Sequence, residues 1–152
     1  MTTRVAAPID LLALAVDHPD LGTSDWRTIT QQQVDLFADA TDDHQWIHAD
    51  PERAKAGPFG TTIAHGYLTV SLAPVFIAEI LQVDSVQMAV NYGLNKVRFP
   101  APVPVGARLR AGLQLTAAQA RGDMVEAVLT LTIQIEGSVR PACVAEVVVL
   151  YR

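Results

Sequence analysis

Cysteine is nearly absent from this sequence, since Cys143 is the only one in 152 residues. A single cysteine excludes an intramolecular disulfide framework and a multi-cysteine zinc site, and it fits a reducing compartment. Charged residues are also few, at 18%, while 50% of the residues are hydrophobic. This composition excludes a disordered chain, and the net charge of −5 argues against a nucleic-acid-binding protein.

Long uninterrupted apolar runs are missing too. The longest uncharged stretch, 56–78, contains several glycine, proline and histidine residues, so we predict no transmembrane helix and no membrane association. A short apolar run near the N-terminus is not followed by a cleavage-like site, so no signal peptide is predicted either. We therefore expect a cytoplasmic protein. Its apolar content predicts a homo-oligomer, because a small domain buries so much apolar surface poorly on its own.

The first half of the chain carries helix signals. A short helix is predicted over 7–16. Thr30 and Gln33 have the spacing of a capping box and open a helix that should end near residue 40. Asp50 precedes a proline and an acidic residue, which predicts the start of another short helix.

A longer helix is predicted over 65–81. Apolar residues occupy most of its circumference, so other structure should enclose it. Pro74 lies inside this segment and should kink the helix, because it removes one backbone donor.

The second half of the chain alternates with the period of strands. Apolar residues recur at every second position over 86–99, with a phase shift beside Gly93 that predicts a bulge or bend. The same alternation returns over 107–115, 125–135 and 143–151. We therefore predict a single α+β domain with two layers, in which the enclosed helix packs against the concave face of a curved antiparallel sheet.

Most of the candidate chemistry lies in the segment 41–50, a connection between two predicted helices. One interpretation is a polar loop whose Asp42 or Asp43 binds nearby backbone amides. A second candidate is His65-Gly66, at the start of the long helix, where unpaired amides can polarise a carbonyl or hold an anion. Glycine there would let a substrate approach the backbone closely.

The stretch 37–54 resembles the hydratase motif of MaoC-like dehydratases, the (R)-specific enoyl-CoA hydratases of the hot-dog fold. The core of that motif is an aspartate followed five positions later by a histidine, here Asp43 and His48. The His-Gly pair that opens the long helix and the strand segment 91–103 are also similar to the family. The residues of all three stretches are most similar to its NodN-like branch.

The resemblance implies an α+β hot-dog fold, with a curved antiparallel sheet wrapped around a long central helix. It covers 26–152, which is expected to be a single MaoC-like domain, and 1–25 is expected to be an N-terminal extension packed on it. It also implies a homodimer with active sites at or near the subunit interface.

The implied activity is hydration of a trans-2-enoyl-CoA to a (3R)-3-hydroxyacyl-CoA, or the reverse dehydration, which makes the protein a hydro-lyase. Asp43 and His48 would hold one water and share the acid–base work, and the Gly66 amide would donate to the thioester oxygen. The coenzyme A thioester is the substrate, and no cofactor and no metal are expected. His44 and His48 have the spacing of a zinc-protease helix motif, but Gln45 stands where that motif needs glutamate.

Five residues are predicted to bind substrate: Gln45, His65, Asn91, Lys96 and Arg98. Lys96 and Arg98 could bind the phosphates of coenzyme A, and a cross-strand ion pair is the alternative. Gln45 stands where many family members have asparagine, and the next residue is a tryptophan where hydratases of the polyester-precursor type have proline.

Two other functions remain open from the sequence. A thioesterase of the same fold would use a carboxylate to attack the thioester or to activate water toward it. A non-catalytic acyl-thioester-binding module would keep the fold without turnover. The retained Asp43–His48 spacing favours the hydratase over the binding module, and thiol release distinguishes the thioesterase.

Overall fold

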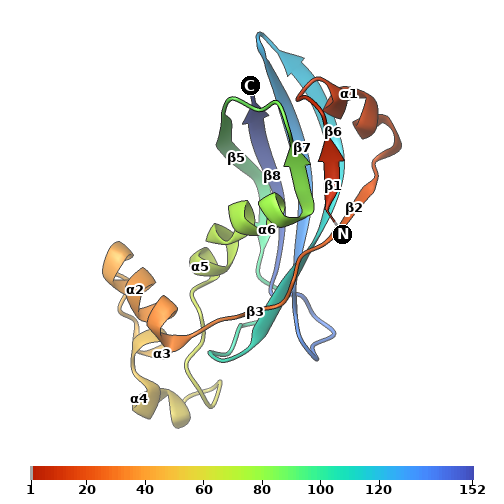
Figure 1. Ribbon diagram of the computed structural model, residues 1–152. Helices are drawn as coiled ribbons and strands as arrows, with labels where there is room; N and C mark the ends of the chain where they lie inside the picture. The colour runs from red at the N-terminus through yellow and green to blue at the C-terminus, as the bar shows by residue number, and fades with distance from the viewer. Residues whose placement is uncertain (1) are drawn as a thin grey trace.

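The computed structural model describes residues 2–152 and is dominated by one antiparallel sheet (Figure 1). Its strand order is β2-β6-β7-β8-β5, and β3 pairs with β6 beside β2. The strands of this sheet are β2 (Asp20–Thr23), β3 (Arg27–Thr28), β5 (Ala89–Arg98), β6 (Arg108–Arg121), β7 (Met124–Ile135) and β8 (Cys143–Tyr151). The predicted α+β class and antiparallel sheet are confirmed.

Alternate burial follows the sequence pattern throughout β7 and in the first part of β6 and β8, whereas the last five residues of β8 are all buried. In β7, every residue at an odd position from Val125 to Ile135 is buried, and the residues between them are less buried. Glycines at positive φ, Gly122 and Gly137, close the β6–β7 and β7–β8 turns, where a side chain would be strained. The β6–β7–β8 meander therefore follows from strand periodicity and turn chemistry together.

Two short helices lie across the concave face of the sheet, α5 (Gly66–Ser71) and α6 (Ala73–Ile80). The prediction of one kinked helix over 65–81 is corrected here: the helix ends at Leu72 and a new one begins at Ala73. Pro74 occupies the first turn of α6, where its missing N–H is not needed. Pro74 therefore lies at the start of a second helix instead of kinking one continuous helix.

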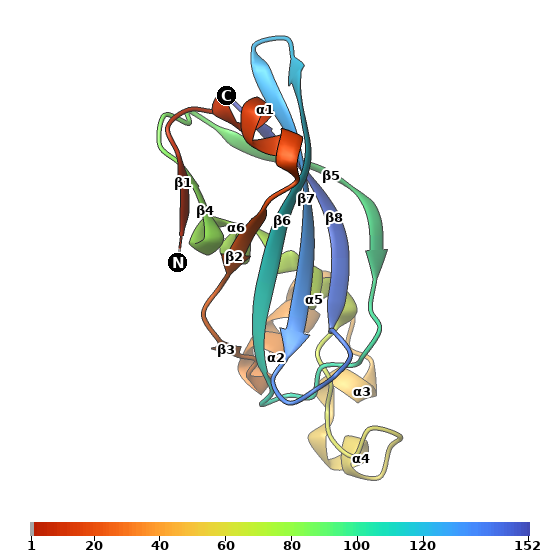
Figure 2. The same ribbon diagram turned by 90° about the vertical axis from the view of Figure 1, so that its right-hand side faces the viewer.

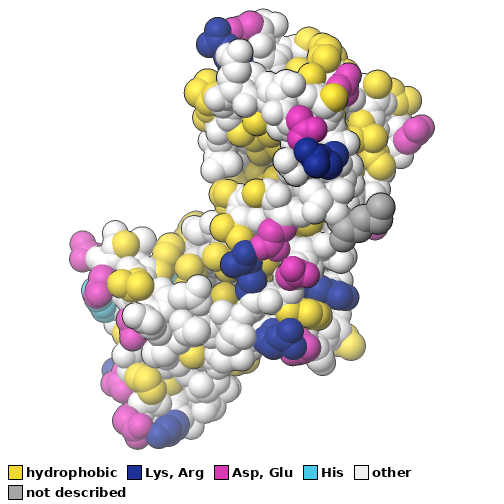
Figure 3. Space-filling view, viewed as in Figure 1, with side chains coloured by type: hydrophobic (Ala, Val, Ile, Leu, Met, Phe, Trp, Pro, Cys, Tyr) yellow, Lys and Arg dark blue, Asp and Glu magenta, His cyan; other side chains and the backbone are white. Residues whose placement is uncertain are grey.

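The expectation that this helix is enclosed is also corrected. Phe76 and Ile80 are fully buried against the sheet, but Tyr67 is 75% exposed and Val75 is 40% exposed. One sheet can cover only one side of a helix, so the opposite side stays open in a single chain. Figure 3 shows hydrophobic side chains gathered in the hollow beside these helices.

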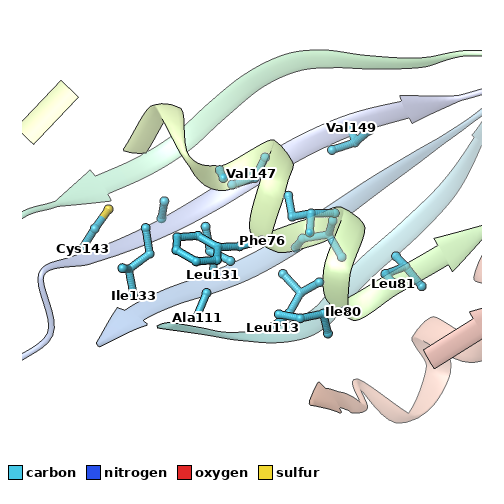
Figure 4. Packing of buried hydrophobic residues seen from close by; sticks show 14 of the residues in the cluster. Phe76, Ile80, Leu81, Ala111, Leu113, Leu131, Ile133, Cys143, Val147 and Val149 are labelled. Atoms are coloured by element: carbon cyan, nitrogen blue, oxygen red, sulfur yellow. The ribbon is translucent and has the colours of Figure 1, made fainter. Parts of the chain in front are cut away.

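The core lies between α6 and the inner face of β6, β7 and β8 (Figure 4). Phe76 and Ile80 point from α6 toward Leu113 and Leu131 on the strands, and all four side chains are at most 2% exposed. Cys143 is buried in this core, and burial raises the pKa of its thiol to about 11. The thiol therefore stays protonated near neutral pH.

Strand β5 is the edge of the sheet and is unusually exposed. Among residues 2–152 it pairs only with β8, and its register shifts on either side of Gly93, which confirms the predicted irregularity. Val90, Tyr92 and Leu94 are 38–53% exposed. A long edge strand with exposed apolar side chains is a site for pairing with another strand.

The N-terminal segment adds features that the sequence pattern did not predict. Strand β1 (Thr3–Val5) pairs in parallel with β4 (Leu81–Val83), which follows α6 directly. The helix predicted over 7–16 begins later, as α1 (Asp10–Leu14), and ends in a 3-10 turn, η1 (Ala15–Asp17). Leu11 and Ala15 join the core, while β2 belongs to the main sheet. The domain boundary at residue 25 stays a prediction.

Three further helices form a lobe below the sheet, α2 (Gln31–Thr41), α3 (Trp46–Ala49) and α4 (Pro51–Lys55) (Figures 1 and 2). Residues 56–65, called the strap below, link this lobe to α5. A β-bridge between Ile63 and Pro104 anchors the strap. Within the part of the chain that is described, no helix has the length and apolar character needed to cross a membrane.

Candidate active site

Helix α2 precedes the site in the chain, and a local sequence feature defines each of its two ends. Thr30 and Gln33 form the predicted capping box, with both reciprocal hydrogen bonds present. At the other end, α2 stops at Thr41, one residue beyond the predicted end, and Asp42 caps it with a positive φ of 58°. This left-handed turn, which aspartate tolerates better than most residues, redirects the chain so that Asp43 begins the connection.

A one-turn helix, α3, places His48, and the sequence pattern did not predict it. Gln45 is its N-cap residue, and the Gln45 carbonyl accepts hydrogen bonds from the amides of His48 and Ala49. The Asp50 carboxylate then accepts from the Arg53 amide and opens α4, as predicted. Two successive N-caps therefore set the path of the chain on either side of His48.

The fold brings three ionisable side chains together. A carboxylate oxygen of Asp43 and one ring nitrogen from each of His48 and His65 lie within 4.8 Å of one another. Asp43 is 51% exposed, whereas His48 and His65 are 7% and 2% exposed. The separation between carboxylate and imidazole lets one water bridge them, and the residue that meets His48 is Asp43 rather than its neighbour Asp42.

The hydrogen bond of His48 fixes its tautomer. Its Nδ1 atom lies 2.6 Å from the carbonyl oxygen of Ile63. Because a carbonyl only accepts, Nδ1 carries the hydrogen and donates it, which leaves the lone pair of the neutral ring on Nε2. The His48 ring therefore has the form that can accept a proton.

Burial lowers the pKa of His48 below 6.5. The hydrogen bond to the Ile63 carbonyl acts in the opposite direction, the nearby His65 lowers the pKa further, and the Asp43 carboxylate raises it. Because burial disfavours the charged imidazolium, His48 is neutral at neutral pH.

His65 lies between the lobe and the central helices. Its Nε2 atom is 2.9 Å from the backbone carbonyl oxygen of Asp43 and 4.0 Å from Oδ2 of the same residue. Its ring stacks on the His48 ring with 3.8 Å between centroids, and Phe37 lies 5.0 Å away. The His65 side chain is buried, and its predicted contact with substrate stays a prediction.

Gln31 contributes to the site and was missed by the sequence reasoning. Its side-chain amide donates to the backbone carbonyl of His48 at 2.8 Å, and its carbonyl oxygen accepts from the Thr62 hydroxyl at 2.6 Å. One side chain thus ties α2 to α3 and to the strap. The first residue of a helix carries no sequence signal for such tertiary hydrogen bonds.

Trp46, the residue at the position where the family resemblance expects proline, packs against two neighbouring segments. The Arg53 guanidinium lies 4.5 Å from the centre of its ring. A Cβ atom at Gly57 would lie only 2.8 Å from the Trp46 ring, so the indole fills the space that glycine leaves. The tryptophan packs α3 against the end of α4.

Gly66 is the first residue of α5, as predicted, so its amide has no acceptor within the helix. A Cβ atom at this position would lie 3.1 Å from the Phe99 ring. In a single chain, the Phe99 ring therefore lies beside the Gly66 backbone, where the sequence predicted a substrate. Phe99 follows β5 directly and links the end of that strand to the start of the central helices.

The other predicted substrate-binding residues lie on β5, apart from the histidine cluster. Asn91 lines a cavity of about 410 Å³ between α5, α6 and the edge of the sheet, together with Ser71, Pro74 and Leu94. Lys96 and Arg98 are exposed, and among residues 2–152 neither forms an ion pair. They lie in the strand that ends beside Gly66, through Phe99.

Two imidazoles and a carboxylate are also a donor set that zinc accepts. In this cluster, however, Nδ1 of His48 and Nε2 of His65 donate to backbone carbonyls, and the two rings are stacked at 26°. A metal would need the remaining nitrogens to converge. The expectation of no metal stays a prediction.

Most of the chain matches the model of a known family. A model described as "MaoC like domain" matches residues 17–137. The chain belongs to the MaoC-like dehydratase family. Its fold is the hot-dog fold, as the sequence resemblance implied.

Individual relatives agree with this assignment. The chain is 57% identical, over 93% of each sequence, to 3-hydroxyacyl-thioester dehydratase Z of Mycobacterium tuberculosis (strain H37Rv). It is 46% identical to nodulation protein N of Rhizobium leguminosarum bv. viciae, over 83% of this chain and 80% of that protein. Among solved structures, an (R)-hydratase from A. caviae involved in PHA biosynthesis is 28% identical with a TM-score of 0.69, covering 84% of this chain and 93% of that one.

Proposed function

We propose that this MaoC-like protein hydrates trans-2-enoyl-CoA to (3R)-3-hydroxyacyl-CoA, or catalyses the reverse dehydration. Dehydratase or hydratase activity on thioesters, and hence the class of hydro-lyases, is supported by the relatives named 3-hydroxyacyl-thioester dehydratase and (R)-hydratase. The observation that carries the finer proposal is the convergence of the Asp43 carboxylate and the neutral His48 imidazole within 4.8 Å.

Asp43 and His48 hold one water between them and share the proton transfers. The water oxygen adds to the β-carbon of the enoyl group, one of its protons passes to the pair, and a proton is delivered to the α-carbon. The lone pair on His48 Nε2 and the exposed Asp43 carboxylate are both able to accept from water. Such positioned acid–base groups contribute roughly 10²- to 10⁴-fold to a rate.

Gly66 supplies the electrostatic part of the mechanism. Negative charge develops on the thioester oxygen during addition, and the free amide at the start of α5 donates to it. For this to happen, the Phe99 ring beside Gly66 moves aside or forms one wall of the substrate site. No cofactor takes part in this scheme, because water and side chains supply every proton.

The substrate carrier is coenzyme A in this proposal. Lys96 and Arg98 are exposed cations without carboxylate partners in the described chain, on the strand that ends next to Gly66. Their charges suit the phosphates of coenzyme A. Gln45 and Asn91 complete the predicted substrate contacts, Gln45 from the N-cap of α3 and Asn91 from the wall of the 410 Å³ cavity.

A homodimer completes the fold in this proposal. The exposed apolar face formed by β5 and the open side of α5 and α6 needs a cover, and a second copy of β5 offers both backbone partners and apolar side chains. Sedimentation of the wild type should give twice the monomer mass. Leu94→Glu should shift it to the monomer, while Val139→Glu, on the β7–β8 turn, should not. A cytoplasmic location stays a prediction.

Incubation with crotonyl-CoA tests the proposed chemistry. Hydration removes the enoyl absorbance without releasing free thiol, and chiral analysis of the product should show the (3R) alcohol. Thiol release would instead identify a thioesterase. Tight binding of crotonyl-CoA with no conversion in either direction would identify a binding module.

A further inference from the structure

His65 is a buried polar residue whose presence calls for a physical explanation. It is 2% exposed, and its Nδ1 atom is buried with no hydrogen-bond partner among residues 2–152. Leaving a buried nitrogen unpaired is unfavourable, and an apolar side chain of similar size would fill the space without that penalty. The contacts of the rest of the imidazole must therefore account for it.

One contact holds the backbone of Asp43. The Asp43 carbonyl oxygen accepts from Nε2 of His65 at 2.9 Å, immediately after the left-handed turn at Asp42. Asp43 lies outside any helix, so this bond fixes a residue that the helices do not. The carboxylate Oδ2 is 4.0 Å from the same nitrogen, which leaves it free to bind water.

The other contact holds the plane of the His48 ring. The two imidazoles stack with 3.8 Å between centroids and 26° between planes. The Ile63 carbonyl holds the His48 ring at its edge, and the stack holds its face. Phe37 of α2 packs against His65 in turn, at 5.0 Å, so the stack is anchored in the lobe.

We infer that His65 is a positioning residue, which holds Asp43 through its N–H and His48 through its ring face rather than contacting the substrate. This inference rests on the proposed hydration by the Asp43–His48 pair. The two contacts are separable by mutation. His65→Gln keeps an amide donor that can reach the Asp43 carbonyl but loses the stack, and His65→Phe keeps an aromatic ring but loses the donor.

Each variant should lower kcat for crotonyl-CoA hydration about 10- to 100-fold with little change in KM, because a small displacement of catalytic groups has effects of this size. His44→Gln is the matched control. His44 lies on the same connection, is about half exposed, and has its Nε2 atom 3.7 Å from Asp39 Oδ1, so its replacement should leave kcat unchanged. Circular dichroism and thermal unfolding establish that each variant is folded.

A pH titration supplies a readout that a purely structural role would not move. The titratable side chains that influence His48 are His65, which lowers its pKa, and Asp43, which raises it. Replacing His65 should therefore raise the pKa of His48 and move the acid limb of kcat/KM to higher pH. NMR of the His48 ring measures the same change without turnover.

The outcomes separate this inference from the proposed function. If the wild type hydrates crotonyl-CoA and both folded variants keep kcat within about twofold of it, the positioning role is overturned. If the wild type leaves crotonyl-CoA unchanged, the proposed function fails and the NMR titration decides. A raised His48 pKa in the variants then supports the positioning contact, and an unchanged pKa in both overturns it.

Discussion

The sheet with its central helices and the lobe formed by α2, α3 and α4 are held together by different forces. In the sheet and central helices, side chains such as Phe76 and Leu129 are fully buried in one continuous apolar core. In the lobe, the residues from Thr41 to Gln45 are exposed, and directional contacts from Gln31 and His65 fix the geometry. Apolar burial therefore dominates the sheet and central helices, whereas hydrogen bonds of single side chains fix the positions of Asp43 and His48 in the lobe.

The largest effect is expected in the lobe. Asp43→Asn and His48→Gln should each lower crotonyl-CoA hydration by roughly 10²- to 10⁴-fold, because in the proposed mechanism each removes one of the two groups that hold the water. The Asp43 backbone carbonyl and its bond to His65 persist in the asparagine variant. Thermal unfolding should change little in Asp43→Asn, because the Asp43 side chain is half exposed. His48→Gln also removes the ring hydrogen bond to Ile63 and the stack on His65, so circular dichroism establishes that this variant is folded.

Asp42→Asn is the matched control for this pair of variants. Asparagine also tolerates the left-handed backbone of residue 42, whose φ is 58°, and the Asp42 side chain is outside the cluster. Activity should stay near that of the wild type. Near-normal turnover in Asp43→Asn together with a large loss in Asp42→Asn would reverse the assignment.

A core substitution should show the opposite profile. Phe76→Ala removes a fully buried ring between α6 and the sheet, and it should lower the free energy of unfolding by about 3–5 kcal/mol. Activity per folded molecule should fall far less than in the Asp43 and His48 variants. Val139→Ala, at a fully exposed position on the β7–β8 turn, should change stability by less than about 0.5 kcal/mol. Urea titration measures both.

Gln31 tests whether the lobe is held by directional bonds. Gln31→Leu removes the donor to the His48 carbonyl and the acceptor for the Thr62 hydroxyl, and it should lower stability by about 1–3 kcal/mol and reduce kcat as well. Gln32→Leu, on the exposed side of the same helix, is the control. Equal effects of the two substitutions on kcat would show that the bonds of Gln31 do not align His48.

The smallest expected effect is a displacement of the pH profile. Burial lowers the pKa of His48 below 6.5, so the neutral base persists to lower pH than a free imidazole allows. The acid limb of kcat/KM should therefore lie below pH 6.5. The same shift makes His48 bind more protons when unfolded, so its contribution to stability is full above 6.5 and is lost as the pH falls toward the lower folded value. An acid limb above 6.5 would contradict this assignment.

Local sequence signals predicted much of both regions. Thr30, Gln33 and Asp50 predicted helix starts because capping depends on neighbours in the chain. The alternation in β6, β7 and β8 predicted the sheet because a strand has a period of two. The resemblance to the MaoC-like hydratase motif identified Asp43 and His48 as the candidate pair, because the motif lies in one short segment.

What the tertiary structure decided depends on contacts between distant segments. The stack of His65 on His48, the bonds of Gln31 and the approach of Phe99 to Gly66 join residues that the sequence separates. The tautomer of His48 depends on the Ile63 carbonyl, which carries no side-chain signal. Pro74 lies in the first turn of a new helix, where its missing N–H costs no hydrogen bond, and this second helix still buries Phe76 and Ile80. The burial of these two side chains depends on the sheet, so only the packed fold determines where the first helix ends.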